Sequence, residues 1–192
     1  GIDFASLEEE KADSPFGEYT GAATIFGASG GVAEAAARTA YYLVTGENIT
    51  NDDIKEMRGV DKNTRSKTVE LDIKGTHVVV RVVSTLKEAE KAIQEIKNGT
   101  AKFQLLEVMA CPGGCVNGGG QPRSSESAQT KVERAEGLYE EDANLKLRHS
   151  HENPDIIRIY KDDLEKPNSH LAHELLHTTY ADKRTGSYKD IN

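Results

Sequence analysis

The sequence predicts an α/β fold in which a small, largely parallel sheet has helices flanking its faces. Residues 68–73 alternate apolar and polar side chains, as a half-buried strand does, and residues 77–83 are almost continuous valine, as in a buried strand. Residues 103–109 form a third apolar run. Between the last two runs, residues 85–97 place apolar side chains at helical spacing. Strand, helix and strand in this order indicate a parallel crossover.

Toward the N-terminus, a strong helix is predicted after a glycine-rich turn. Residues 1–20 are acidic and mixed in character, and we expect them to be irregular. The turn at 24–31 opens a helix whose apolar residues recur at helical spacing, and Gly46 is expected to end it. Residues 50–53 have side chains suited to capping a further short helix that ends near Gly59.

Beyond residue 124 the sequence predicts helices separated by polar loops. The segment 125–147 is polar and helical in pattern, a second helix runs from Pro154 to about residue 164, and a short helix covers 169–177. The tail from 182 to 192 is expected to be frayed, as chain ends commonly are.

Composition and charge argue against nucleic acid and membranes as binding partners of this chain. The 192 residues include 24 basic and 32 acidic side chains, for a net charge of −8, and show no basic stripe of the kind that binds nucleic acid. No run of about 18 apolar residues is present, so no membrane span is expected. The first residues show no signal-peptide pattern. Two cysteines are too few for a disulfide framework, and a cytoplasmic location fits free thiols.

The loop after residue 109 carries the residues best suited to chemistry. Cys111 and Cys115 lie in a segment, 107–122, that contains five glycines. Thiolates are the ligands of iron–sulfur clusters, and glycines let the backbone approach a cluster closely. On spacing alone, the alternative is a mobile glycine-rich loop with two free thiols. A thioredoxin-like redox pair fits less well, because that motif separates its cysteines by two residues and this loop separates them by three.

The same loop resembles the third cluster-binding motif of the [FeFe]-hydrogenases, or iron-only hydrogenases. The resemblance includes the core Met-Ala-Cys-Pro-Gly-Gly-Cys at 109–115 and the ending Gly-Gly-Gly-Gln-Pro at 118–122. Further parts of that family are resembled by segments 13–17, 20–21, 26–32, 58–59, 151–154 and 175–180. The resemblance therefore implies that residues 1–192 form the C-terminal lobe of the two-lobed catalytic domain.

The resemblance also implies a cofactor and roles for individual residues. The cofactor is the H-cluster, a [4Fe-4S] cluster joined to a two-iron subsite at which protons and hydrogen react. Cys111 and Cys115 would ligate the [4Fe-4S] part, and Cys115 would also bridge to the subsite. Met109, Phe26 and Val32 would line the pocket around it. Electrons would come from a ferredoxin or a nicotinamide-linked redox partner.

The sequence departs from the family pattern at two points. The family has Met where this chain has Ala33, and a larger side chain where it has Ala37. These differences imply either repacking of the helix near the pocket or altered tuning of the site. A cubane cluster takes four cysteine ligands, and this chain contains two. The other two would come from the N-terminal lobe, so the chain alone is expected to be inactive and to hold no cluster or an incomplete one.

Two other functions remain open from the sequence. The chain could be a non-catalytic, excised or partner-binding module of the same fold, and its exposed lobe face could form a homodimer. A more remote alternative is a zinc hydrolase, because His173, Glu174 and His177 fit the pattern H-E-x-x-H. The zinc pattern lacks an evident third ligand downstream, and the ordinary interpretation is that Leu175 and Leu176 pack inward beside polar histidines.

Overall fold

A computed structural model describes the chain except for residues 11–12, 14–15, 51–53, 62, 64, 180, 183–188 and 191–192. The chain divides into two compact units, one of residues 19–153 and one of residues 1–18 together with 154–192. The expectation that 1–192 forms a single lobe stays a prediction. Within the described residues, no helix has both the length and the apolar character needed to cross a bilayer.

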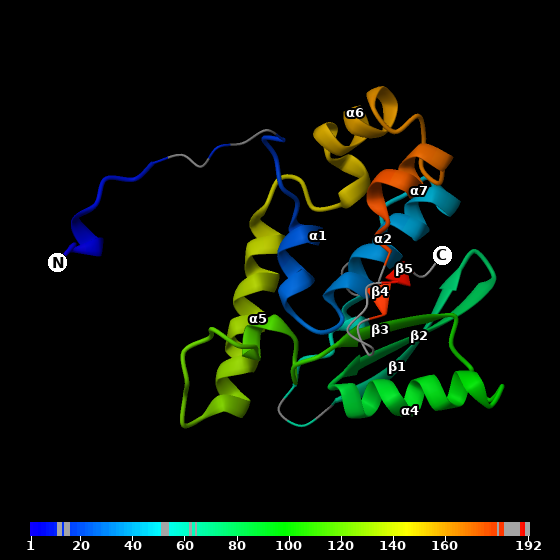
Figure 1. Ribbon diagram of the computed structural model, residues 1–192, viewed down its shortest axis with the longest axis horizontal. Coiled ribbons are helices and arrows are strands. Elements are labelled where there is room, and N and C mark those ends of the chain that lie inside the picture. The colour runs from blue at the N-terminus through cyan, green and yellow to red at the C-terminus, as the bar shows by residue number, and fades with distance from the viewer. Residues whose placement is uncertain are drawn as a thin grey trace. The chain divides into compact units, whose positions relative to one another are not determined.

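The unit of residues 19–153 is built around a three-stranded sheet in the order β1-β2-β3. Its strands are β1 (Ser66–Ile73), β2 (Thr76–Ser84) and β3 (Leu105–Met109). β2 and β3 are parallel, with Val80 opposite Leu105, and α4 (Leu86–Lys97) connects them. This connection confirms the predicted crossover. The helices α2 (Gly31–Thr45) and α4 lie on opposite faces of the sheet (Figure 1).

The prediction of a largely parallel sheet is wrong for the other pair of strands, because β1 and β2 run antiparallel. Only Lys74 and Gly75 separate the two strands, and a parallel connection needs a much longer crossover. Both residues have positive φ, 51° and 81°, which is the backbone of a type I′ hairpin turn. The sheet is therefore mixed. The pair Lys74-Gly75 between two apolar runs was the sequence signal for the hairpin.

The main core lies between α2 and the sheet. It contains Ala33, Ala37, Ile54, Met57, Val69, Leu71, Val80 and Val82. Both alanines that depart from the family pattern are therefore buried, with 1% and 6% of their surface exposed. Helix α2 ends as predicted at Gly46, whose φ of 77° lets its N–H donate to the Tyr42 carbonyl. Glycine adopts this conformation at a helix end without steric cost.

Shorter elements complete this unit. They are α1 (Gly21–Thr24), η2 (Ile25–Gly27), η3 (Lys55–Met57), η4 (Cys115–Asn117), α5 (Ser127–Asn144) and η5 (Ser150–Glu152), where η denotes a 3₁₀ turn. The short helix predicted near residues 50–59 falls partly outside the described residues, and η3 is what the described part contains. Helix α5 confirms the polar helix predicted for 125–147, and it lies beside α1 (Figure 1).

The second unit combines the N-terminal segment with the C-terminal helices. It contains η1 (Phe4–Ser6), α6 (Pro154–Asp162), α7 (His170–Leu176), β4 (Ala181–Asp182) and β5 (Lys189–Asp190). The predicted helices at 154–164 and 169–177 are thus present. β4 and β5 pair antiparallel, and the rest of the tail predicted to be frayed lies outside the described residues. Leu175 and Leu176 do not pack inward, since they are 61% and 57% exposed.

Candidate metal centre

The cysteine loop begins where β3 ends, at the edge of the sheet. The backbone N–H of Thr85, which follows β2, donates to the Met109 carbonyl at 2.7 Å. Two turns follow, and they hold the two cysteines. The Gly114 N–H donates to the Cys111 carbonyl at 3.0 Å, and η4 starts at Cys115. Each cysteine begins a hydrogen-bonded turn, so the loop has a defined path between them.

A close backbone contact attaches this loop to the segment before α2. The Ser29 N–H donates to the Gly113 carbonyl at 3.0 Å. Gly114 has φ 92°, and a Cβ atom there would lie 2.7 Å from the Ser29 nitrogen and 2.9 Å from the Gly27 oxygen. Only glycine allows the two backbones to approach this closely. The two segments that contain the predicted site residues are therefore held together at this point.

A small second hydrophobic core packs against the cysteine loop. Val116 is buried with Ala28 of the neighbouring segment and Ala135 of α5. From α5, Arg134 donates hydrogen bonds to the carbonyls of Val116 and Pro122, at 3.0 and 2.8 Å. Both hydrogen bonds come from one residue of an 18-residue helix, and they attach η4 and the end of the glycine-rich segment to α5. The loop is thus positioned by secondary structure on two sides.

Glu107 joins β3 to the start of α2. Its carboxylate accepts hydrogen bonds from the backbone N–H groups of Gly30, at 2.6 Å, and Ala33, at 2.8 Å. Burial raises the pKa of this carboxyl above its ordinary value, and the backbone hydrogen bonds oppose the rise. The first N–H groups of a helix have no partner within the helix, so a carboxylate there satisfies them. This contact holds residues 30–33 beside the strand that leads into the cysteine loop.

The five predicted site residues differ in exposure. Cys111 and Met109 are half-buried, whereas Cys115 is exposed. Phe26 and Val32 are 45% and 37% exposed, which is high for apolar side chains beside a core. The backbone contacts above bring their two segments, 26–32 and 109–115, side by side. Among the described residues, no third His, Cys, Asp or Glu forms a ligand group with the cysteines.

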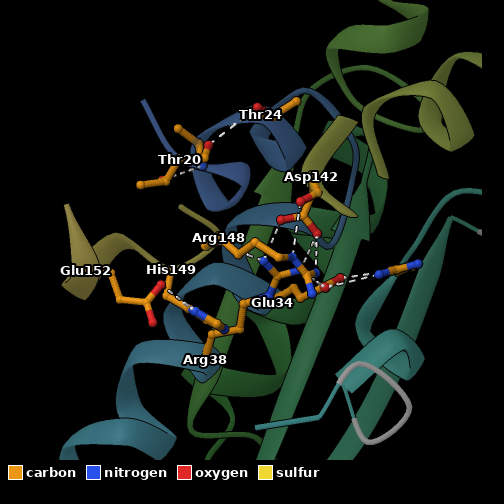
Figure 2. A network of polar contacts seen from close by, with 10 residues as sticks. Thr20, Thr24, Glu34, Arg38, Asp142, Arg148, His149 and Glu152 are labelled. Atoms are coloured by element: carbon orange, nitrogen blue, oxygen red, sulfur yellow. Dashed lines mark hydrogen bonds and ion pairs between the residues drawn. The ribbon is translucent and has the colours of Figure 1, made fainter. Parts of the chain in front are cut away.

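A buried ionic network behind the site was not predicted from the sequence (Figure 2). Arg38 of α2 donates two hydrogen bonds to the Asp142 carboxylate of α5, both 2.8 Å, and one to Glu34 at 2.6 Å. Arg148 also donates to Asp142, at 2.7 Å. Arg58 donates to Glu34, at 3.1 Å, and its guanidinium lies 3.9 Å over the ring of Tyr139. The network attaches α2 to the helix that supports the cysteine loop.

The charges in this network shift the pKa values of its members. Burial alone would raise the pKa of Asp142, but the hydrogen bonds from Arg38 and Arg148 outweigh burial and lower it. The sequence contains one signal for the network, the spacing of Glu34 and Arg38 by one helical turn. The partner Asp142 lies more than a hundred residues further along the chain, and no local pattern identifies it.

The H-E-x-x-H pattern does not assemble a zinc site within the described residues. Helix α7 ends at Leu176, so His177 is the residue that caps it rather than a member of its last turn. The rings of His173 and His177 are 4.5 Å apart and meet edge to face. In the part of the chain that the structure describes, no third ligand joins them. The hydrolase alternative gains no support from this geometry.

The α/β unit with a cysteine loop at the end of a parallel strand has the form of a metal-binding protein. The sequence pattern described as "Iron only hydrogenase large subunit, C-terminal domain" matches residues 1–119, and "Iron hydrogenase small subunit" matches residues 128–183. The chain belongs to the iron-only hydrogenase family.

Individual relatives agree with this assignment. The NADP-reducing hydrogenase subunit HndD of Solidesulfovibrio fructosivorans is 45% identical over 93% of this chain and 30% of its own length. The solved structure of the [FeFe]-hydrogenase HydA1 from Chlamydomonas reinhardtii matches with a TM-score of 0.64, at 36% identity, over 93% of this chain and 51% of that chain. The human nuclear prelamin A recognition factor is 30% identical over 74% of this chain and 31% of its own length. The chain thus spans about a third to a half of these proteins.

Proposed function

We propose that this chain forms the C-terminal side of the H-cluster pocket in an iron-only hydrogenase that catalyses reversible oxidation of hydrogen and reduction of protons. The observation that carries the proposal is the cysteine loop, which is held by backbone and helix contacts beside exposed Phe26 and Val32. Two soft thiolate donors within a turn-rich glycine segment fit the ligand chemistry of an iron–sulfur cluster. When bound, the H-cluster would supply the iron at which hydrogen reacts and would pass electrons to and from it.

In this proposal the residues of the chain have distinct tasks. With the H-cluster bound, Cys111 and Cys115 would provide two of the thiolate ligands, and Cys115 would be the one shared with the two-iron subsite. Met109, Phe26 and Val32 form an apolar wall that excludes water from the reacting iron, and such a wall influences the reduction potential of a cluster. Glu107 is a positioning residue, because it fixes the helix start that bears Val32 relative to the strand that bears Met109.

The remaining parts of the active enzyme lie outside this chain in the proposal. The chain contains two cysteines, and a cubane cluster takes four, so the N-terminal lobe supplies the others. That lobe also covers the exposed apolar residues of the site. Ferredoxin or a nicotinamide-linked chain delivers the electrons. Alone, the chain does not turn over hydrogen.

The second candidate is a non-catalytic member of the same fold. The similarity to the nuclear prelamin A recognition factor favours it. The higher identity to a hydrogenase subunit, 45% against 30%, and the complete cysteine loop favour the enzyme.

A chimera tests the choice directly. Residues 1–192 replace the matching segment of the HndD subunit, and clusters are reconstituted anaerobically. We expect hydrogen evolution with a reduced viologen dye, and we expect Cys115→Ser to abolish it and to lower the iron and sulfide content. Ser124→Ala, in an exposed loop, is the control and should keep both. A folded chimera that binds iron and sulfide but evolves no hydrogen would favour the non-catalytic candidate.

A further inference from the structure

A cluster of two histidines and one glutamate lies at η5, apart from the cysteine loop in the fold. His149 precedes η5, and His151 and Glu152 belong to it. Each of the three offers a donor atom, and these atoms lie within 4.8 Å of one another. Among the described residues, this is the only such group of three. His149 is well shielded, with 13% of its side chain exposed, and Glu152 is 35% exposed.

An open chain of hydrogen bonds, which runs from His149 through Glu152 and Asn48 to His151, holds these side chains in place. His149 Nδ1 lies 2.9 Å from one Glu152 oxygen, as Figure 2 shows, and the Asn48 amide N–H₂ donates to the other at 2.8 Å. Because that amide donates to Glu152, its oxygen faces His151 Nε2, at 3.0 Å. On the other side of the ring, His151 Nδ1 lies 3.2 Å from the Thr39 hydroxyl.

The donor set has the chemistry of a transition-metal site. We propose that His149, His151 and Glu152 bind a divalent transition metal, Zn²⁺ above all, with the side-chain oxygen of Asn48 beside them as a fourth donor. Two imidazole nitrogens and one carboxylate are a ligand combination that binds zinc in proteins. The 3₁₀ turn favours it, because side chains three residues apart, such as those of His149 and Glu152, lie above one another there.

The distances are compatible with a tetrahedral ion after small side-chain rotations. Zinc–nitrogen bonds of about 2.0–2.1 Å place neighbouring tetrahedral ligands about 3.4 Å apart. The contacts of 2.9 and 3.0 Å within the cluster are shorter than this value, and 4.8 Å bounds the longest separation. For His149, His151 and Glu152, an ion between the donor atoms therefore requires small movements of the side chains, which rotation about terminal torsions supplies.

The surroundings also resemble those of a metal-binding histidine. The ring of Tyr42 stacks on His151 with centroids 4.1 Å apart and an angle of 12°. On metal binding, neutral His151 would shift its proton from Nε2 to Nδ1, where it hydrogen-bonds to the Thr39 hydroxyl, and neutral His149 would shift its proton from Nδ1 to Nε2, which frees one nitrogen of each ring for the metal. A hydrogen bond to the second ring nitrogen orients a ligating histidine in this way. Bound zinc would join η5 to α2 and to Asn48 just after it.

Zinc titration of the full chain tests the proposal. The titration is done in a Cys111→Ser/Cys115→Ser background, because the thiolates themselves bind zinc. We expect one zinc ion per chain by competition with a colorimetric chelator, and a visible cobalt spectrum typical of nitrogen and oxygen ligands. Zinc should also raise the thermal midpoint, because it binds the folded chain.

Two variants and two controls make the result specific. His149→Ala and Glu152→Gln should weaken zinc binding by about 10- to 100-fold or more. The glutamine of Glu152→Gln still accepts the Asn48 hydrogen bond, so the thermal midpoint of this variant without zinc should stay close to the parent value. Glu152→Gln therefore keeps the test valid if His149→Ala misfolds. His77→Ala, at an exposed histidine paired with Glu70, and His173→Ala/His177→Ala should bind zinc as the parent does. Absence of zinc binding, or binding that depends on His173 and His177 instead, would overturn the proposal.

Discussion

At the scale of single residues, Gly114 decides how the cysteine loop meets its neighbours. Its φ of 92° belongs to the left-handed region, and its Cα faces the backbone of residues 27–29 without room for a side chain. Gly119 lies in the same loop, and a Cβ atom added there would have no other atom within 4 Å. The two glycines therefore differ in what a methyl group would meet, although the sequence presents them alike.

We predict that Gly114→Ala destabilises the protein by about 2 kcal/mol or more, because it combines positive-φ strain with backbone overlap. Gly119→Ala, the matched control, should change the unfolding free energy by no more than about 0.5 kcal/mol. Urea denaturation followed by circular dichroism measures both values. Equal effects of the two substitutions would show that the contact with residues 27–29 does not govern the loop.

At the scale of elements, one carboxylate determines how β3 and α2 fit together. The Glu107 oxygens accept from two N–H groups at the first turn of α2, which otherwise lack partners. An amide in place of the carboxylate would turn one acceptor into a donor and direct it at another donor. The position of Val32 and of the loop that follows β3 both depend on this contact.

We predict that Glu107→Gln lowers the unfolding free energy by about 1–3 kcal/mol, the cost of a buried donor without a partner. Amide hydrogen exchange at residues 30–33 should accelerate in the variant. Glu70→Gln on the exposed side of β1 is the control and should leave both quantities nearly unchanged. Unaltered exchange at residues 30–33 would refute the role of Glu107 as the link between strand and helix.

At the scale of the whole molecule, a buried charge network joins segments that lie far apart in the sequence. Asp142 has no solvent exposure and accepts from Arg38 and Arg148. Its pKa in the folded protein is lower than its ordinary value of 3.8. A carboxyl group whose pKa is lowered by folding stabilises the folded protein at every pH above its ordinary pKa. That contribution is lost as the pH falls from the ordinary pKa through the lowered one.

We predict that Asp142→Asn destabilises the protein at pH 7 by about 3 kcal/mol or more, because it leaves the buried Arg38 and the half-buried Arg148 with too few partners. The difference between parent and variant should shrink as the pH falls from 3.8 through the lowered pKa of Asp142, since the parent then loses the same contribution. The urea denaturation midpoints of both proteins across this pH range measure the difference. Glu141→Gln, next to it but exposed, should show no such pH dependence, and a constant difference for Asp142→Asn would contradict the assignment.

Periodicity predicted most of the helices and strands in this chain. Helix α2, helix α4 and strands β2 and β3 all follow apolar patterns that depend on neighbouring residues alone. The error was in the direction of β1, although the turn residues Lys74 and Gly75 specify it locally. The cysteine loop was also identifiable, because its residues are contiguous in the sequence.

The sequence alone determined the family, the crossover and the two thiols, since each rests on residues close together in the chain. Only the tertiary structure decided which side chains that are far apart in the sequence come into contact. Glu107 finds the start of α2, Arg38 finds Asp142, and His151 lies beside Asn48 only after the chain has folded. These contacts depend on the spacing of packed elements, which no local pattern encodes, and they position both the cysteine loop and the histidine cluster.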